Sequence, residues 1–176
     1  EQCPGDSYRV VAADGGWWGY GGKGVSGDVP VLNAPIVATD TMPATDGHWL
    51  FGADGGVFAY GTAPFLGSTG NIELNEPIVG AAATPTGGGY WLFASDGGVF
   101  SYGDAPFLGS LGNLILNQPI VAGAATPSGL GYVLFAADGG VFSFGDAPFD
   151  GSLGNLTLNQ PIVAGDATYS GDGYWL

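Results

Sequence analysis

The fold is decided by one stretch, residues 89–102, which reads Gly-Tyr-Trp-Leu-Phe-Ala-Ser-Asp-Gly-Gly-Val-Phe-Ser-Tyr. Its two apolar runs are typical of β-strands, and the Asp-Gly pair between them is a strong hairpin signal. The same turn pattern recurs along the chain, beginning at Asp14, Asp54, Asp96 and Asp138. The last three copies are 42 residues apart, and the first lies 40 residues before the second. The sequence therefore predicts a tandem repeat of one short β unit.

Each unit holds four candidate strands and no helical pattern. In one unit they are residues 77–83, 90–94, 99–102 and 107–110, and Gly or Pro interrupts every candidate within eight residues. Four strands in about 42 residues match the size of a propeller blade. The small residues at 80–83 and 122–125 are expected on crowded innermost strands. The prediction is an all-β protein, a small β-propeller of about four four-stranded blades. An open β-solenoid of the same repeats is the alternative.

The chain is expected to form one repeat domain, residues 7–176, behind a short tail, residues 1–6. We divide the domain into units at 7–34 (divergent or partial), 35–76, 77–118, 119–160 and 161–176 (partial). The two partial units could share strands and close a ring. Tyr174-Trp175-Leu176 nevertheless repeats the role of Tyr8-Arg9-Val10, so a longer array, or pairing of the surplus strand with another subunit, is also predicted.

The strongly negative charge of the chain limits the classes of molecule that it is expected to bind. Arg9 and Lys23 are the two basic residues against sixteen acidic ones, a formal net charge of -14. Binding to nucleic acid depends on Lys and Arg, so no nucleic-acid partner is expected. Anionic membrane surfaces are disfavoured for the same reason, and no apolar run is long enough for membrane insertion.

Cys3 is the only cysteine, so a disulfide within the chain is impossible. It is interpreted either as an unimportant terminal thiol or as a candidate for an intermolecular disulfide.

Residues 89–110, from Gly-Tyr-Trp-Leu through Gly-Asp-Ala-Pro-Phe-Leu-Gly-Ser, resemble tandem repeats of secreted bacterial, notably actinobacterial, cell-surface proteins. The resemblance covers nearly the whole chain. It implies a propeller-like, secreted, extracellular or cell-surface module without catalytic activity. This sequence departs from the pattern at Trp17-Trp18 in the first unit. It departs again at His48, where other units have Tyr90, Tyr132 and Tyr174.

No catalytic constellation is visible in the sequence. His48 is the only histidine, and neither a Gly-x-Ser-x-Gly elbow nor a His-Glu-x-x-His motif is present. We therefore expect no enzyme and no cofactor, and we expect His48 to be a packed or rim residue.

The repeated aspartates are interpreted as turn residues rather than metal ligands. Asp-Gly is what a tight hairpin requires, so structural turn roles are assigned to Asp14, Asp54, Asp96 and Asp138. Asp104 and Asp146 would be further calcium candidates, but Gly22 and Thr62 stand at the equivalent positions, and no metal is predicted.

The leading hypothesis is a non-catalytic extracellular structural or adhesive module that self-assembles into a surface array or filament. Units that almost lack lysine have little protection against edge-to-edge pairing, which favours self-association or neighbouring subunits as partners. The alternative is a multivalent carbohydrate-binding module for cell-wall or extracellular glycans. A sugar ring could stack on an exposed aromatic side chain, and the candidates are Trp17, Trp18, Trp49 and Trp91.

Overall fold

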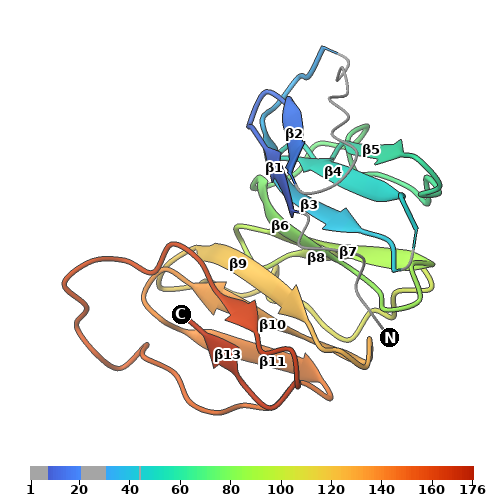
Figure 1. Cartoon of the computed structure of the whole chain (residues 1–176). Coiled ribbons are helices and arrows are strands. Elements are labelled where there is room, and N and C mark those ends of the chain that lie inside the picture. The colour runs from blue at the N-terminus through green and yellow to red at the C-terminus, as the bar shows by residue number, and fades with distance from the viewer. Residues whose placement is uncertain (1–7, 21–30, 44) are drawn as a thin grey trace.

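The computed structural model describes residues 8–20, 31–43 and 45–176 (Figure 1). These residues form β-strands and no helix, so none of them belongs to a helix that could cross a bilayer. Cys3 and Lys23 lie outside the described residues. The strands are β1 (Tyr8–Val11), β2 (Trp17–Tyr20), β3 (Ile36–Thr41), β4 (His48–Gly52), β5 (Val57–Tyr60), β6 (Ile78–Ala83), β7 (Gly89–Ala94), β8 (Val99–Gly103), β9 (Ile120–Ala125), β10 (Gly131–Ala136), β11 (Val141–Gly145), β12 (Asp166–Ala167) and β13 (Tyr174–Trp175).

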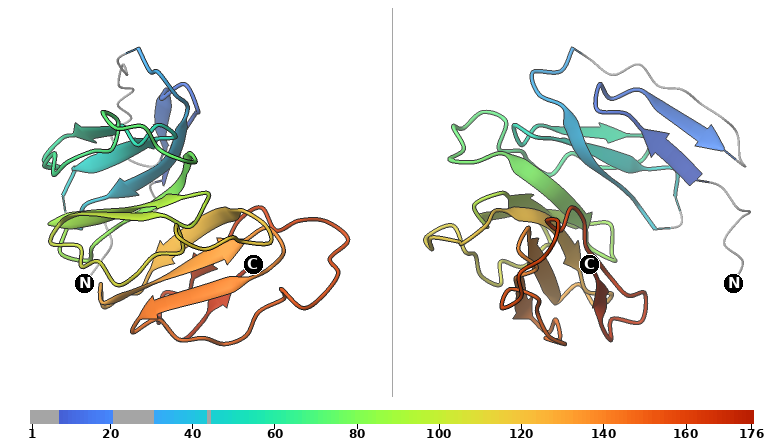
Figure 2. Two further views of the ribbon diagram at one scale, coloured as in Figure 1. Left: turned by 180° about the vertical axis from the view of Figure 1, so that it is seen from behind. Right: turned by 90° about the vertical axis from the view of Figure 1, so that its left-hand side faces the viewer.

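Three sheets repeat one antiparallel arrangement. Their strand orders are β3-β4-β5, β6-β7-β8 and β9-β10-β11. Two hairpins, β1-β2 and β12-β13, lie at the two ends of this series (Figure 1). Figure 2 shows that the sheets fan out side by side, with neighbouring sheets packed face to face. This is the arrangement of consecutive propeller blades, and it confirms the predicted fold class.

The middle strand of each sheet is buried on both faces. All six residues of β7 and all six of β10 are buried, because a neighbouring sheet covers each side. Doubly covered strands read as continuous apolar runs, which explains the Tyr-Trp-Leu-Phe-Ala sequence. The core of the protein therefore lies between the sheets rather than inside any one of them.

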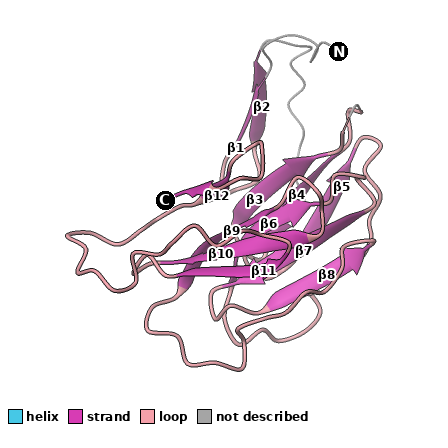
Figure 3. Cartoon of the chain, turned by 90° about the horizontal axis from the view of Figure 1, so that it is seen from below, coloured by secondary structure: helices cyan, strands magenta, loops and turns pink. Residues whose placement is uncertain are grey.

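The small-residue strands are the innermost ones, as predicted. β3, β6 and β9 contact one another in succession, and β12 follows β9 (Figure 3). A Cβ atom built on Gly123 of β9 would lie 2.5 Å from the Phe93 ring, so no larger residue fits there without a shift. Each of β3, β6 and β9 also carries a register shift of the β-bulge type near its start.

One backbone hydrogen bond ties each unit to the next. The Ile78 amide donates to the Ala53 carbonyl at 2.9 Å, and the Ile120 amide donates to the Ser95 carbonyl at 2.8 Å. The equivalent bonds run from Ile36 to Ala13 and from Ile162 to Ala137, at 2.8 and 2.9 Å. The junction between units is thus built from the same atoms four times.

One detail of the prediction was wrong. The blades have three strands, because residues 107–110 form no strand. Their backbone bonds instead to the Tyr132 hydroxyl, and Gly109 has a left-handed φ of 135°. Two arrangements of the ends were left open, and among the described residues β1-β2 and β12-β13 form separate sheets that share no strand.

Candidate functional site

The innermost strands line a concave axial groove of about 1070 Å³. Its walls come from β3, β6, β9 and the segment around β12, and most lining side chains are Ala, Gly, Thr or Pro. Figure 3 shows β3, β6 and β9 lying next to one another. Because these side chains are small, the groove exposes peptide backbone and methyl groups to a ligand.

Asp40 and Asp166 are the charged side chains among the described residues that line this groove. Asp40 is partly buried, and its Oδ2 accepts a hydrogen bond from the Ala83 amide of the next sheet at 2.7 Å. Asp166 is exposed, and its Oδ1 accepts from the Ala167 amide at 2.8 Å. Asp40 and Asp166 occupy equivalent positions of their units, and the two units between them have Ala82 and Ala124 at that position. The groove therefore carries negative charge in two of its four units.

Asp104 and Asp146, the further calcium candidates of the sequence, accept hydrogen bonds from neighbouring hydroxyl groups. Asp104 accepts hydrogen bonds from the Thr84 hydroxyl at 2.8 Å and the Thr86 hydroxyl at 2.5 Å. Asp146 accepts equivalent bonds from Thr126 and Ser128. Within the part of the chain that the structure describes, no cluster of three or more His, Cys, Asp or Glu side chains has the arrangement of a metal site.

The hairpin aspartates have the geometry of turn residues. In each turn, Oδ1 accepts a hydrogen bond from the glycine amide two residues later, at 2.8–3.0 Å. The intervening glycines have φ values of 77–82°, a region that favours glycine. The four aspartates are Asp14, Asp54, Asp96 and Asp138.

Three of the four tryptophans named as glycan candidates cannot take that role. Trp17 is 7 % exposed, and Trp49 and Trp91 are fully buried. Both buried indoles donate to proline carbonyls, Trp49 to Pro64 and Trp91 to Pro106, at 2.8 Å each. The prediction was wrong for Trp49 and Trp91 because both faces of their middle strands are covered, and for Trp17 of β2 because its ring packs against His48. Trp18 alone of the four is exposed, at 51 %.

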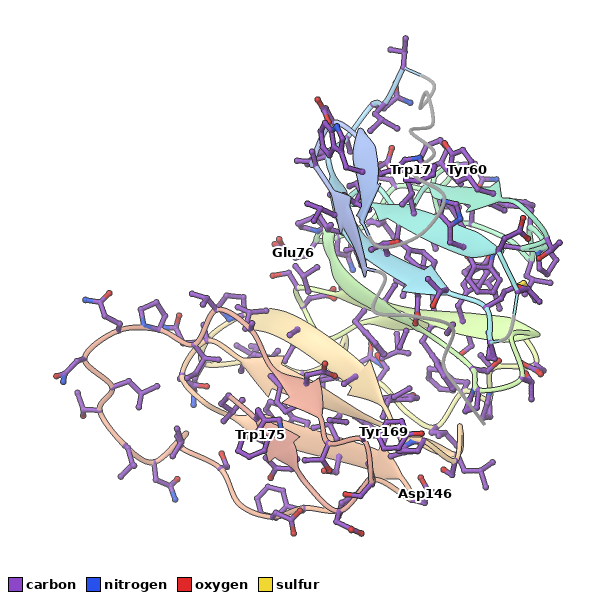
Figure 4. The ribbon with its side chains drawn as sticks, in the orientation of Figure 1. Trp17, Tyr60, Glu76, Asp146, Tyr169 and Trp175 are labelled. Carbon is purple, nitrogen blue, oxygen red and sulfur yellow. The ribbon has the colours of Figure 1, made fainter. Side chains whose placement is uncertain are left out.

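Sequence reasoning missed the exposed phenylalanines. Phe65, Phe107 and Phe149 are 61–62 % exposed and follow an Ala-Pro pair in three successive units. The proline directly before each phenylalanine disfavours a central strand, and it was the signal that could have separated these residues from the core aromatics. Trp175 was also missed as an exposed aromatic residue and lies at the C-terminal hairpin (Figure 4).

His48 is a packed residue. It is buried and stacks on the Tyr60 ring at a centroid distance of 5.1 Å, and Trp17 meets it edge-on at 5.4 Å. Figure 4 places Trp17 and Tyr60 close together at the upper right of the view, where β2 and β5 lie. The Nδ1 atom of His48 lies 3.3 Å from the Asp46 carbonyl oxygen. Aromatic rings thus surround the imidazole.

Tyrosines at the blade junctions have perturbed acidity. Burial raises the pKa of Tyr90 and of Tyr132, an effect that their hydrogen bonds to backbone groups partly offset. Burial also raises the pKa of Tyr60 and Tyr102. All four side chains stay protonated at neutral pH and act as hydrogen-bonding or packing groups.

No family model matches the chain, and no curated protein matches it. Solved structures of β-propellers do match the chain. Sqt1 from Chaetomium thermophilum matches 95 % of this chain with a TM-score of 0.63 and 17 % identity. The C-terminal WD40 domain of Sif2 matches 97 % with a TM-score of 0.59 and 18 % identity. Sqt1 bound to the N-terminus of ribosomal protein L10 matches 95 % with a TM-score of 0.63 and 16 % identity.

The chain spans about half the length of these proteins, between 48 % and 52 %. At this level of identity the likeness is one of fold. It agrees with the β-propeller architecture described above.

Proposed function

We propose that this protein is a non-catalytic, extracellular adhesive module whose axial groove holds a basic segment of a partner protein. The observation that carries the proposal is the groove itself. It is lined by small side chains and carries Asp40 and Asp166, in a chain with a net charge of -14. Complementary charge favours a Lys- or Arg-containing partner and speeds its association.

The shape of the groove suits an extended polypeptide. Its small side chains let a partner backbone approach closely, and the two carboxylates lie three units apart along the series of blades. One of the similar solved structures, Sqt1, is a complex with the N-terminus of ribosomal protein L10. That complex supports the idea that a propeller of this kind binds a peptide segment.

The recurring polar residues support a non-catalytic role. Asp54, Asp96 and Asp138 hold turns, and Asp104 and Asp146 accept hydrogen bonds from neighbouring hydroxyls. Catalysis usually requires one tuned set of groups, whereas these groups repeat in unit after unit as scaffold.

The test is binding of a fluorescent (Ala-Lys)₅ peptide, measured by anisotropy at several salt concentrations. We expect binding that weakens with salt and is lost in the Asp40→Asn/Asp166→Asn variant. The matched control is Glu73→Gln/Glu76→Gln, which removes the same charge from exposed positions outside the groove lining. Equal binding by both double variants, or no binding by the parent protein, would contradict the proposal.

Secretion and self-association belong to the same proposal and rest on the resemblance and on the lysine-poor edges. Electron microscopy of the secreted protein tests them. Regular filaments or sheets are the expected result, and dispersed particles at all concentrations would remove self-assembly from the proposed function.

Carbohydrate binding is a second candidate function. The observation that favours it is an exposed phenylalanine at the same place in three successive units. Binding of any neutral glycan on an array is the first test of this function.

A further inference from the structure

Three phenylalanines are exposed at equivalent positions. Phe65, Phe107 and Phe149 are 42 residues apart and expose 61–62 % of their surface. An isolated exposed apolar residue needs no explanation. An aromatic side chain that is exposed to solvent at the same position in three units needs one.

The backbone on both sides of Phe65 is held by buried aromatic residues. Before it, the Pro64 carbonyl accepts a hydrogen bond from the Trp49 indole at 2.8 Å. After it, the Leu66 amide donates to the Tyr90 hydroxyl of the next sheet at 3.1 Å. Phe65 is therefore presented to solvent on a fixed piece of chain.

The same device recurs in the next two units. Phe107 lies between Pro106, which accepts from Trp91 at 2.8 Å, and Leu108, which donates to Tyr132 at 3.1 Å. Around Phe149, the Pro148 carbonyl accepts from the Ser143 hydroxyl at 2.9 Å, and the Asp150 amide donates to Tyr174 at 3.0 Å. A loop whose backbone is held in this way loses little further freedom when a ligand binds.

Phe65 lines an open groove of about 540 Å³. Asn33, Asn71 and Asp54 line the same groove. Asp54 is fixed by its bond from the Gly56 amide at 2.9 Å, and Ser68 by its bond to the Gly55 carbonyl at 3.0 Å. Phe65 thus shares this groove with two asparagines and with a carboxylate and a hydroxyl group that hydrogen bonds hold in place.

The sequence repeats this set of groups in three units. The phenylalanine, the two asparagines and the aspartate all recur at intervals of 42 residues. The three sets are Phe65, Asn33, Asn71 and Asp54; Phe107, Asn75, Asn113 and Asp96; and Phe149, Asn117, Asn155 and Asp138.

We propose that these three sets, named the Phe row, bind a neutral polysaccharide, one sugar ring stacking on each phenylalanine. The proposal rests on the carbohydrate-binding candidate function. A sugar ring offers an apolar face to an aromatic side chain and hydroxyl groups to amides and carboxylates. A repeating polymer matches a repeated site, and weak equivalent sites gain by avidity. The net charge of -14 disfavours acidic polysaccharides.

The experiment is affinity gel electrophoresis of the full chain in gels containing hydroxyethyl cellulose, glycol chitin or pullulan. We expect retardation in at least one gel. The Phe65→Ala/Phe107→Ala/Phe149→Ala variant should lose it, and a variant with one phenylalanine left should bind about 100-fold more weakly, the lower end of avidity gains.

Two further variants test the role of the flat aromatic face. Replacing all three phenylalanines by tyrosine should preserve retardation, and replacing them by leucine should abolish it. The matched control is Ile72→Ala/Leu114→Ala/Leu156→Ala, which removes apolar side chains that are 52–61 % exposed at the same 42-residue spacing. Circular dichroism and the melting temperature establish that each variant is folded.

The outcomes separate this proposal from the others. No retardation in any gel, unchanged retardation of the triple alanine variant, or equal loss in the control variant overturns the Phe row. So does a leucine variant that binds as well as the parent, since this would indicate a general apolar surface for a protein partner. Array binding of glycans that survives the triple alanine substitution would retain the candidate function and place it elsewhere. Binding of the basic peptide to the axial groove is independent and should be unchanged by these substitutions.

Discussion

The hydroxyl of Tyr132 donates a hydrogen bond to the carbonyl oxygen of Gly109, 2.6 Å away and 23 residues earlier in the chain. The same hydroxyl accepts a bond from the Leu108 amide at 3.1 Å. Tyr90 makes the same pair of bonds to Leu66 and Gly67. A buried side chain thus satisfies backbone groups that a fourth strand would otherwise pair, and it fastens each sheet to the one before.

Removing this hydroxyl should destabilise the protein. Tyr132→Phe leaves a partly buried amide and carbonyl without their partner, which costs about 1–3 kcal/mol. Urea unfolding followed by tryptophan fluorescence measures the loss. Tyr174→Phe is the control, because Tyr174 makes the same bonds at a more exposed position, and its effect should be smaller. Equal effects at the two positions would argue against burial as the cause.

Stability should fall at alkaline pH. Burial raises the pKa of Tyr90 and Tyr132 above the ordinary value of 10.0. Well below pH 10 both tyrosines are protonated in the folded and the unfolded chain. Above it, the unfolded chain loses protons that the folded chain keeps, so the free energy of unfolding decreases until the pH passes the folded pKa. Urea midpoints between pH 8 and pH 11 test this, and Tyr90→Phe/Tyr132→Phe should flatten the decline.

A methyl group at Gly109 should cost more than one at Gly151. A Cβ on Gly109 would lie 2.7 Å from the Phe144 ring, whereas no described atom lies within 4 Å of a Cβ on Gly151. Both glycines have positive φ values, 135° and 117°, so backbone strain is common to the two substitutions. Gly109→Ala should therefore be more destabilising than Gly151→Ala by about 1–3 kcal/mol. Thermal unfolding measures the difference, and Gly109→Ala/Phe144→Ala should recover part of it.

Calcium should leave the melting temperature unchanged. Asp104 and Asp146 each accept bonds from two hydroxyl groups, so their oxygens are already engaged. Differential scanning fluorimetry with millimolar calcium and with EDTA checks this. A clear rise with calcium that disappears in Asp104→Ala/Asp146→Ala would show a metal site instead.

The turns and the innermost strands could be predicted because one local pattern determines each. Asp96 and Gly97 specify a tight hairpin whatever surrounds them, and the small residues at 80–83 fit only where strands crowd together. The three-stranded blade could not be predicted in the same way. Residues 107–110 resemble a strand locally, and their actual partner is a side chain, Tyr132, of the following unit.

The candidate site was harder to predict than the fold. Alternation of apolar and polar residues along a strand distinguishes its inner from its outer face only when the outer face is exposed to solvent. Trp49 and Trp91 lie on strands that are covered on both faces. These two glycan candidates are therefore core residues. The exposed Phe107 lies outside the strands, where no hydrophobic period applies, and only its place after Pro106 distinguishes it.

The repeated bond between the first amide of each inner strand and the turn carbonyl of the preceding unit bears on how such a chain changes over generations. Because every junction uses the same atoms, an in-frame genetic duplication of one 42-residue unit would create a boundary that already fits. Loss of a unit would rejoin its neighbours equally well. Recombination between repeats could therefore alter the number of Phe-row positions, and with it the strength of attachment, without any new contact having to evolve.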